Sequence, residues 1–359
     1  MTTERIYFGH WRPSAKRHPR SVVRGVVSLL VGALAVCVAL PTSNGGSAAA
    51  ALSHAMSITA ISKVLPSPGC KAKTAVTAGV IIQTMVVGGR DRTYEVDVPS
   101  SYTGKRPYGL VLGLHPLSVT YQFMPSEVGF AAMQQKYNFI GVAPSGLTTP
   151  TPFWDAAPTT PNYDVTFLAA LLTHLERTLC VNDAQVFSTG ISNGAQMSSL
   201  LGCRMSHRLA GIAPVEGEEY LTPCNGRPMP ILAFHGTADP VLPYSGGGLN
   251  ATEIAKLYAW HGVIPTGMPK PLGIDESMSL WAKHNGCNPK PVEVRVAFDV
   301  QKRTWTGCRA KTVLYIIDGG GHGWPGKPVP AMEKQFGHDT SSIDASSLIF
   351  RFFFGHPSR

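Results

Sequence analysis

One short stretch of the chain, residues 184–205, constrains the fold more than any other. An apolar run over residues 184–188 predicts a strand, residues 190–194 read Gly-Ile-Ser-Asn-Gly, and a helix is predicted over residues 195–205. This is the pattern Gly-x-Ser-x-Gly between a strand and a helix. A serine on such a turn has strained backbone geometry, and the glycines leave room where a Cβ would clash. Amides at the start of the next helix favour negative charge. The stretch therefore predicts Ser192 as a nucleophile.

A glycine-rich turn between a strand and a helix could instead bind the phosphates of a nucleotide. The two sequence patterns typical of such turns, G-x-G-x-x-G and G-x-x-x-x-G-K-[ST], are both absent here. We therefore expect no nucleotide and no other cofactor.

Predicted strands alternate with predicted helices over residues 76–356. A turn at residues 88–91 joins the strands predicted over 80–87 and 92–98 into an antiparallel hairpin. Further strands are predicted over 108–114, 139–143, 209–215, 230–234 and 312–317, and further helices over 126–137, 164–180 and 340–354. This alternation favours an α/β fold with a mostly parallel sheet, helices on both faces, and the hairpin at one edge.

A serine nucleophile needs a base and a group that orients the base. Asp239 follows the strand predicted over 230–234, and His322 follows the strand predicted over 312–317. The order serine, aspartate, histidine is that of an α/β-hydrolase. In such a triad His322 takes the proton of Ser192, and Asp239 accepts a hydrogen bond from the other imidazole nitrogen.

Two other residues compete for these roles. Asp318 is the alternative acid, although it lies very close in sequence to His322. His235 also ends a predicted strand, and its alternative role is a hydrogen bond that braces a loop.

An oxyanion hole needs two amide donors. One candidate is Asn193, directly after the serine, and the other belongs to the loop after the strand over 108–114, which begins His115-Pro116-Leu117. Proline has no N–H, so we expect Leu117 to be the second donor.

The net charge of +9 lies mainly at the N-terminus. Residues 1–40 hold six Lys and Arg against one Glu, and the rest of the chain has no basic cluster, so we do not expect nucleic-acid binding. An apolar run of 16 residues, 25–40, follows the basic segment and is too short to span a bilayer. We predict a signal peptide over 1–50, a flexible linker over 51–75 and one catalytic domain over 76–356. The protein is then a secreted monomer with no stable membrane span, unless the N-terminal segment stays uncleaved as an anchor.

The cysteine count agrees with export. Cys37 lies within the predicted signal peptide, and six cysteines remain. An even number in an exported chain predicts three disulfides. No C-x-x-C pair is present, so no metal site is expected. Cys287 and Cys308 bracket one β-rich segment and are expected to pair.

Five segments, in order, carry a resemblance to a known family. They are residues 190–194, 213–217, 235–244, Trp281 with 285–287, and 320–326. The chain resembles the secreted poly(3-hydroxybutyrate) depolymerase family, which also includes feruloyl and acetylxylan esterases, over roughly residues 70–356. The resemblance implies an α/β-hydrolase esterase with the triad Ser192, Asp239 and His322. The family's half-cystines imply the pairs Cys203–Cys224 and Cys287–Cys308, which leaves Cys70 and Cys180 for each other.

The chain departs from the family pattern in three places. Pro116 stands where the family usually has glycine, and Ala195 replaces another usual glycine. Residues 249–275 form a longer insertion, which we expect to be a wall or lid over the substrate or else a plain surface loop. The candidates for substrate contact are Trp324, Trp154, Trp260 and His115.

The sequence therefore predicts a secreted serine esterase. Its substrate would be a hydroxyalkanoate polyester or oligomer, or a feruloyl or acetyl ester on plant polysaccharide. The chain ends soon after its last predicted helix with no appended domain, which favours small or oligomeric esters. The alternative is a binding protein with weakened catalysis, suggested only by Pro116.

Overall fold

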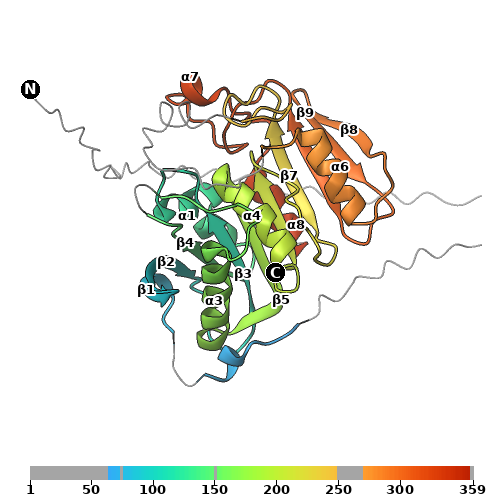
Figure 1. Cartoon of the computed structure of the whole chain (residues 1–359). Coiled ribbons are helices and arrows are strands. Elements are labelled where there is room, and N and C mark those ends of the chain that lie inside the picture. The colour runs from blue at the N-terminus through green and yellow to red at the C-terminus, as the bar shows by residue number, and fades with distance from the viewer. Residues whose placement is uncertain (1–63, 73–75, 149–151, 249–269, 356–359) are drawn as a thin grey trace, which may run out of the picture. The chain divides into compact units, whose positions relative to one another are not determined.

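A computed structural model of the chain describes residues 64–72, 76–148, 152–248 and 270–355 (Figure 1). Its centre is a ten-stranded sheet in the order β1-β2-β4-β3-β5-β6-β7-β10-β9-β8. The six middle strands run parallel: β4 (Phe139–Pro144), β3 (Tyr108–Leu114), β5 (Val181–Ile191), β6 (Gly211–Val215), β7 (Ile231–Gly236) and β10 (Thr312–Ile317). These strands are almost entirely buried, as expected for parallel strands with both faces covered.

Antiparallel hairpins close both edges of the sheet. The predicted hairpin is β1 (Gly79–Val87) with β2 (Arg90–Val98), and its two-residue turn has Gly88 and Gly89 at φ 59° and 73°, which suits glycine. The other edge carries β8 (Val292–Ala297) and β9 (Val300–Trp305). The sequence predicted a hairpin at one edge only; between Cys287 and Cys308 it predicted a β-rich segment without placing that segment in the sheet.

Helices cover both faces of the sheet, as predicted. On one face α3 (Tyr163–Thr178), α4 (Asn193–Arg204) and α6 (Ile274–His284) share a core with the strands. On the other face α1 (Met124–Val128), α2 (Phe130–Gln134) and α8 (Ala345–Phe354) form a second core (Figure 1). The short elements are η1 (Pro68–Lys71), η2 (Tyr121–Phe123) and α7 (Glu333–Phe336).

Two helix predictions need correction, and one helix was missed. The helix predicted over 126–137 is divided at Gly129, whose left-handed backbone (φ 76°) ends α1 before α2 begins. The last helix begins at Ala345 rather than at 340, because the side chain of Asp344 caps it by accepting from the Ser347 N–H at 2.6 Å. The helix α6 was not predicted.

Three disulfides join the pairs Cys70–Cys180, Cys203–Cys224 and Cys287–Cys308. These are the pairs that the family resemblance implied. Disulfides of this number are typical of proteins that fold in an oxidising compartment, so they favour an extracellular protein. In the part of the chain that the structure describes, no helix has the length and apolar composition needed to cross a membrane.

The predicted linker over 51–75 is in part an ordered element. Ser67 is buried, its N–H donates to the Val181 carbonyl at 2.9 Å, and its hydroxyl donates to the Leu179 carbonyl at 2.9 Å. The disulfide from Cys70 to Cys180 holds the same segment against the start of β5. The folded domain therefore extends back at least to residue 64. The predicted signal peptide lies outside the described residues.

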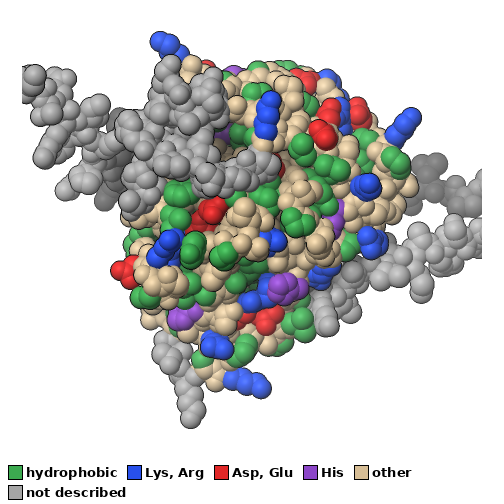
Figure 2. Space-filling model, in the orientation of Figure 1, with side chains coloured by type: hydrophobic (Ala, Val, Ile, Leu, Met, Phe, Trp, Pro, Cys, Tyr) green, Lys and Arg blue, Asp and Glu red, His purple; other side chains and the backbone are tan. Residues whose placement is uncertain are grey.

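Charged side chains are spread over the domain surface. On the face shown in Figure 2, Lys and Arg side chains are interspersed with Asp, Glu and neutral residues.

Candidate active site

Ser192 lies on the sharp turn between β5 and α4. Its backbone has φ 57° and ψ −124°, a conformation that non-glycine residues rarely adopt. A Cβ on Gly194 would lie 2.0 Å from the Leu114 carbonyl oxygen, and a Cβ on Gly190 would lie 2.6 Å from the backbone of Gly194. The Ser192 N–H donates to the Val215 carbonyl at 3.0 Å. The two glycines thus let α4 start directly against β3 and β5, and the hydrogen bond to β6 holds the strained residue in place.

The loops after β7 and β10 bring an acid and a histidine together. His322 Nδ1 lies 2.7 Å from Asp239 Oδ2, and both side chains are buried. The other oxygen, Oδ1, accepts from the amides of Val241 and Leu242 at 2.7 and 2.9 Å. Burial alone would raise the pKa of Asp239, but the imidazole of His322, the nearby His235 and the Leu242 amide lower it below its usual value. Asp239 is therefore an anion that accepts a hydrogen bond from His322 Nδ1.

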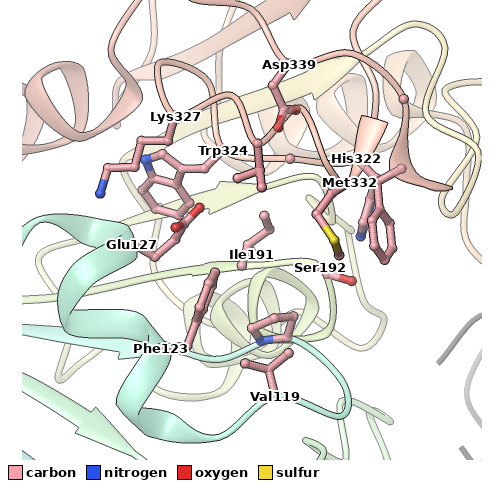
Figure 3. A pocket seen from close by; sticks show the side chains of 15 residues that line it. Val119, Phe123, Glu127, Ile191, Ser192, His322, Trp324, Lys327, Met332 and Asp339 are labelled. Carbon is pink, nitrogen blue, oxygen red and sulfur yellow. The ribbon is translucent and has the colours of Figure 1, made fainter. Parts of the chain in front are cut away.

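The other nitrogen of that imidazole is available for chemistry. His322 Nε2 is buried and has no hydrogen-bond partner among the described residues. Ser192 and His322 line one cavity of about 250 Å³, where their side chains lie close together (Figure 3). No hydrogen bond joins them in the described structure, and such contacts often shorten only when substrate binds. The arrangement can deprotonate a serine that attacks a bound electrophile.

Asp318, the alternative acid, lies elsewhere. Its carboxylate accepts from Gln301 Nε2 at 3.0 Å and pairs with Arg295 at 2.9 Å, on the antiparallel edge of the sheet. Its side chain remains 36% exposed. The geometry therefore brings Asp239, and not Asp318, to the imidazole of His322.

His235, the alternative histidine, is fully buried inside β7. Its Nδ1 lies 3.1 Å from the Glu218 carboxylate, and its Nε2 lies 2.8 Å from the Leu242 carbonyl in the loop that carries Asp239. Glu216, His235 and Asp239 offer atoms within 4.8 Å of one another, which is close enough for a metal ion. Both nitrogens of His235 and both oxygens of Asp239 already have protein partners, however, so these side chains are arranged to brace the loop.

Glu216 is a buried carboxyl group that the sequence reading did not single out. It follows β6 with φ 51°, and both its oxygens lie 3.1 Å from the Gly236 amide nitrogen. Burial and the negative charges of Asp239 and Glu218 raise the pKa of Glu216 well above its usual value. Burial and its two acidic neighbours therefore favour the protonated form of Glu216, which limits the negative charge placed beside Asp239.

Two backbone amides are candidates for the oxyanion hole. Asn193 is the first residue of α4, so its N–H has no acceptor within the helix. The N–H of Leu117 has no hydrogen-bond acceptor among the described residues. Pro116, the residue before Leu117, lines the cavity.

His115 and Trp154, predicted to contact substrate, have a different place. Both are completely buried, and neither is among the residues that line the cavity. His115 Nδ1 donates to the Pro116 carbonyl at 2.8 Å, and its Nε2 accepts from the Gly146 amide at 2.8 Å. Trp154 Nε1 donates to the His115 carbonyl at 3.0 Å. These side chains hold the loop that presents Leu117, because their polar atoms face the backbone rather than the cavity.

The Asn193 side chain links Trp154 to the sharp turn between β5 and α4. Its Oδ1 accepts from the Trp154 amide at 2.7 Å and its Nδ2 donates to the Trp154 carbonyl at 3.0 Å. The two candidate oxyanion segments are thereby tied to each other.

Trp324 is the predicted contact residue that does line the cavity. Its indole is almost wholly buried and is fixed by a hydrogen bond from Nε1 to Ser346 Oγ at 3.1 Å. Trp260 lies outside the described residues, as does most of the insertion over 249–275. The described end of that insertion, residues 270–275, leads into α6 and does not line the cavity.

The remaining cavity walls were not predicted. They come from the segment around α1 and from the loop after β10, which are far apart in sequence (Figure 3). Their members include Val119, Phe123, Glu127, Lys327, Val329, Met332, Phe336 and Asp339. No local pattern marks such residues, because only the fold brings the two segments together.

Comparison with known proteins assigns the chain to a family. No family model matches it. Feruloyl esterase C of Emericella nidulans is 30% identical over 243 residues, which cover 65% of this chain and 82% of that protein. A probable feruloyl esterase C of Aspergillus niger is 29% identical over 268 residues, 71% of this chain and 83% of the relative. Among solved structures, an acetyl xylan esterase from Aspergillus awamori shares the fold, with a TM-score of 0.50 at 15% identity over 71% of this chain and 97% of that one. The chain therefore belongs to the feruloyl esterase family of α/β-hydrolases and is a serine-type carboxylic ester hydrolase.

Proposed function

We propose that this protein hydrolyses hydroxycinnamoyl esters, of which feruloyl esters are one kind, with Ser192, His322 and Asp239 as its catalytic triad. The observation that carries the proposal is the buried Asp239–His322 pair, whose free Nε2 faces the cavity that Ser192 also lines. The relatives named for feruloyl ester hydrolysis support the substrate class.

In the first half of the reaction, His322 Nε2 takes the proton of Ser192 as Oγ attacks the ester carbonyl carbon. The negative charge on the carbonyl oxygen is stabilised by the amides of Asn193 and Leu117. Asp239 stabilises the imidazolium through its bond to Nδ1. His322 then gives the proton to the departing alcohol oxygen, which leaves an acyl group on Ser192.

In the second half, water takes the place of the alcohol. His322 removes a proton from the water, whose oxygen attacks the acyl carbon, and then returns that proton to Ser192 Oγ as the acid is released. The same two amides stabilise the second oxyanion. Both halves use the same proton acceptor, so the triad returns to its starting state.

Pro116 is compatible with this chemistry. It contributes no N–H, but the neighbouring Leu117 amide has no other acceptor among the described residues. No observation here favours a weakened, purely binding protein. We further propose that residues 1–50 direct secretion, in keeping with the three disulfides.

The test is steady-state hydrolysis of methyl ferulate by the full chain and three variants. Ser192→Ala should lower kcat by a factor on the order of 10⁴–10⁶ while the protein stays folded. Asp239→Asn should lower it by about 10⁴, because the wrong imidazole tautomer is favoured. Asp318→Asn is the matched control and should keep its activity. Loss of activity in Asp318→Asn with retention in Asp239→Asn would reverse the assignment of the acid.

A further inference from the structure

The cavity at Ser192 has a polar end as well as a reactive end. Glu127, near the end of α1, lines the cavity on the side away from Ser192 and His322 (Figure 3). Most of the lining between them is apolar and includes Ile191, Phe123 and Trp324. Glu127 is half-buried, and a partner would offset the cost of removing its carboxyl group in part from water.

That partner is not found within the described residues. Lys327 lies nearby, but its ammonium group donates to the Ser126 carbonyl, and it forms no ion pair with Glu127. No hydrogen bond from another described residue reaches the Glu127 carboxyl group. The carboxyl oxygens are thus left to accept from whatever occupies the cavity.

The electrostatics of the site agree with this picture. Burial raises the pKa of Glu127 to about 7, the Lys327 charge opposes the rise, and the negative charge of Asp339 adds to it. Near neutral pH the group is therefore present in both its ionised and its protonated form. Either form accepts a hydrogen bond, and the ionised form accepts the stronger one.

The walls define the shape of the group that fits. The indole of Trp324 is fixed by its bond to Ser346, so it offers a rigid flat surface. In the view of Figure 3, Ile191 lies between Trp324 and Ser192, and Phe123 lies below Glu127. A planar, unsaturated acyl group with a hydroxyl at its far end matches a mostly apolar cavity that has a hydrogen-bond acceptor on the side away from Ser192.

We propose that Glu127 accepts a hydrogen bond from the phenolic hydroxyl of the acyl group and thereby selects para-hydroxylated cinnamoyl esters over cinnamoyl esters without that hydroxyl. The inference rests on the proposed hydroxycinnamoyl esterase function. It adds the residue that recognises the phenolic end of the acyl group. Lys327 has a positioning role, since its bond to Ser126 holds the end of α1 that carries Glu127.

The test compares kcat/KM for methyl p-coumarate with kcat/KM for methyl cinnamate, which differ only in the phenolic hydroxyl. Glu127→Leu should lower this ratio about tenfold or more, because a hydrogen bond to a charged group is lost. The change should appear mainly as a higher KM for methyl p-coumarate. Glu127→Gln keeps the shape and one acceptor oxygen, so it should lower the ratio less, and it serves if the leucine variant does not fold.

Glu276→Leu is the matched control, since Glu276 is an exposed carboxylate on α6 and does not line the cavity. It should leave the ratio at its wild-type value. If Glu127→Leu lowers kcat/KM equally for both substrates, Glu127 has a structural role only and the inference is wrong.

Wild-type activity on three substrates separates this inference from the proposed function. If wild-type protein hydrolyses both cinnamoyl esters with equal kcat/KM, the selection by Glu127 is refuted while the cinnamoyl esterase function stands. If it hydrolyses p-nitrophenyl acetate but neither cinnamoyl ester, both the substrate class and the inference are refuted. A preference for methyl p-coumarate that depends on Glu127 supports both.

Discussion

Protonation of His115 should lower the stability of the protein and disturb the loop that presents Leu117. The imidazole is completely buried and is used at both nitrogens, with Nδ1 donating to Pro116 and Nε2 accepting from the Gly146 amide. A proton on Nε2 would break the bond from Gly146 and place two donors face to face. Burial is the main cause that lowers the pKa of His115 from its usual 6.5 to about 4, and the Arg92 charge adds to it against the opposing bond to Pro116. The folded protein therefore favours a neutral His115.

The size of the effect follows from the two pKa values. Between about pH 6.5 and pH 4 the unfolded chain binds a proton on His115 that the folded protein does not. Stability is fully present above pH 6.5 and is lost as pH falls through this window, with no further loss below about pH 4. At about 1.4 kcal/mol for each of roughly 2.5 pH units, protonation of His115 lowers the free energy of unfolding by about 3.5 kcal/mol in full, of which about 3 kcal/mol is lost by pH 4.

The assay is urea unfolding of wild-type protein and His115→Gln at pH 7, 6, 5 and 4. Glutamine does not titrate and offers both a donor and an acceptor, so it can replace the two bonds of the neutral imidazole. Other buried groups titrate in the same range, among them Asp97 and Asp339, whose pKa values are about 6. These groups are present in both proteins, so the difference between the two pH profiles isolates His115. We expect the wild type to lose about 3 kcal/mol more than the variant between pH 7 and pH 4.

Parallel pH profiles for the two proteins would refute this reasoning, because they would mean that His115 titrates normally or that its protonation is tolerated. A second readout is kcat at pH 7. His115→Gln should keep most of it if the two bonds, rather than the imidazole itself, hold the Leu117 loop.

Two further predictions concern the covalent framework and the oxyanion loop. Replacing both Cys70 and Cys180 by alanine should lower the free energy of unfolding by about 4.8 kcal/mol, because that disulfide closes a loop of 110 residues. Replacing both Cys287 and Cys308 should lower it by about 3.3 kcal/mol, because that loop has 21 residues. Equal losses in urea unfolding would contradict the loop-entropy account. Pro116→Gly should change kcat on p-nitrophenyl butyrate by no more than a few-fold, whereas a gain above roughly 50-fold would show that the native loop lacks a donor.

Much of the geometry of the candidate site could be predicted because it is encoded locally. Ser192 has glycines two residues to either side, and Asp239 and His322 each follow an apolar strand at the same edge of a parallel sheet. These are short-range patterns, and the fold class that they predict is confirmed. The β8–β9 hairpin escaped prediction as such because its exposed strand carries valines that face solvent, so burial does not explain its pattern.

The features of the site that could not be predicted from the sequence depend on the direction in which a side chain points. Trp154 and His115 lie near the reactive serine in the fold, yet their polar atoms face backbone groups, which no periodicity reveals. Glu127 could not be predicted as a cavity-lining residue for a second reason. It belonged to a predicted helix over 126–137, and only the break at Gly129 and the loop carrying Lys327 turn its position into a cavity wall.

The backbone of Ser192 carries a thermodynamic consequence beyond its chemistry. Its positive φ costs the native state about 1–3 kcal/mol of conformational strain, because a residue with a Cβ rarely adopts this backbone conformation whereas glycine adopts it readily. Ser192→Gly should therefore unfold at a higher urea concentration than Ser192→Ala, although we expect both variants to be inactive. At this one residue selection for activity and selection for stability oppose each other, and the serine persists at the expense of a more stable fold.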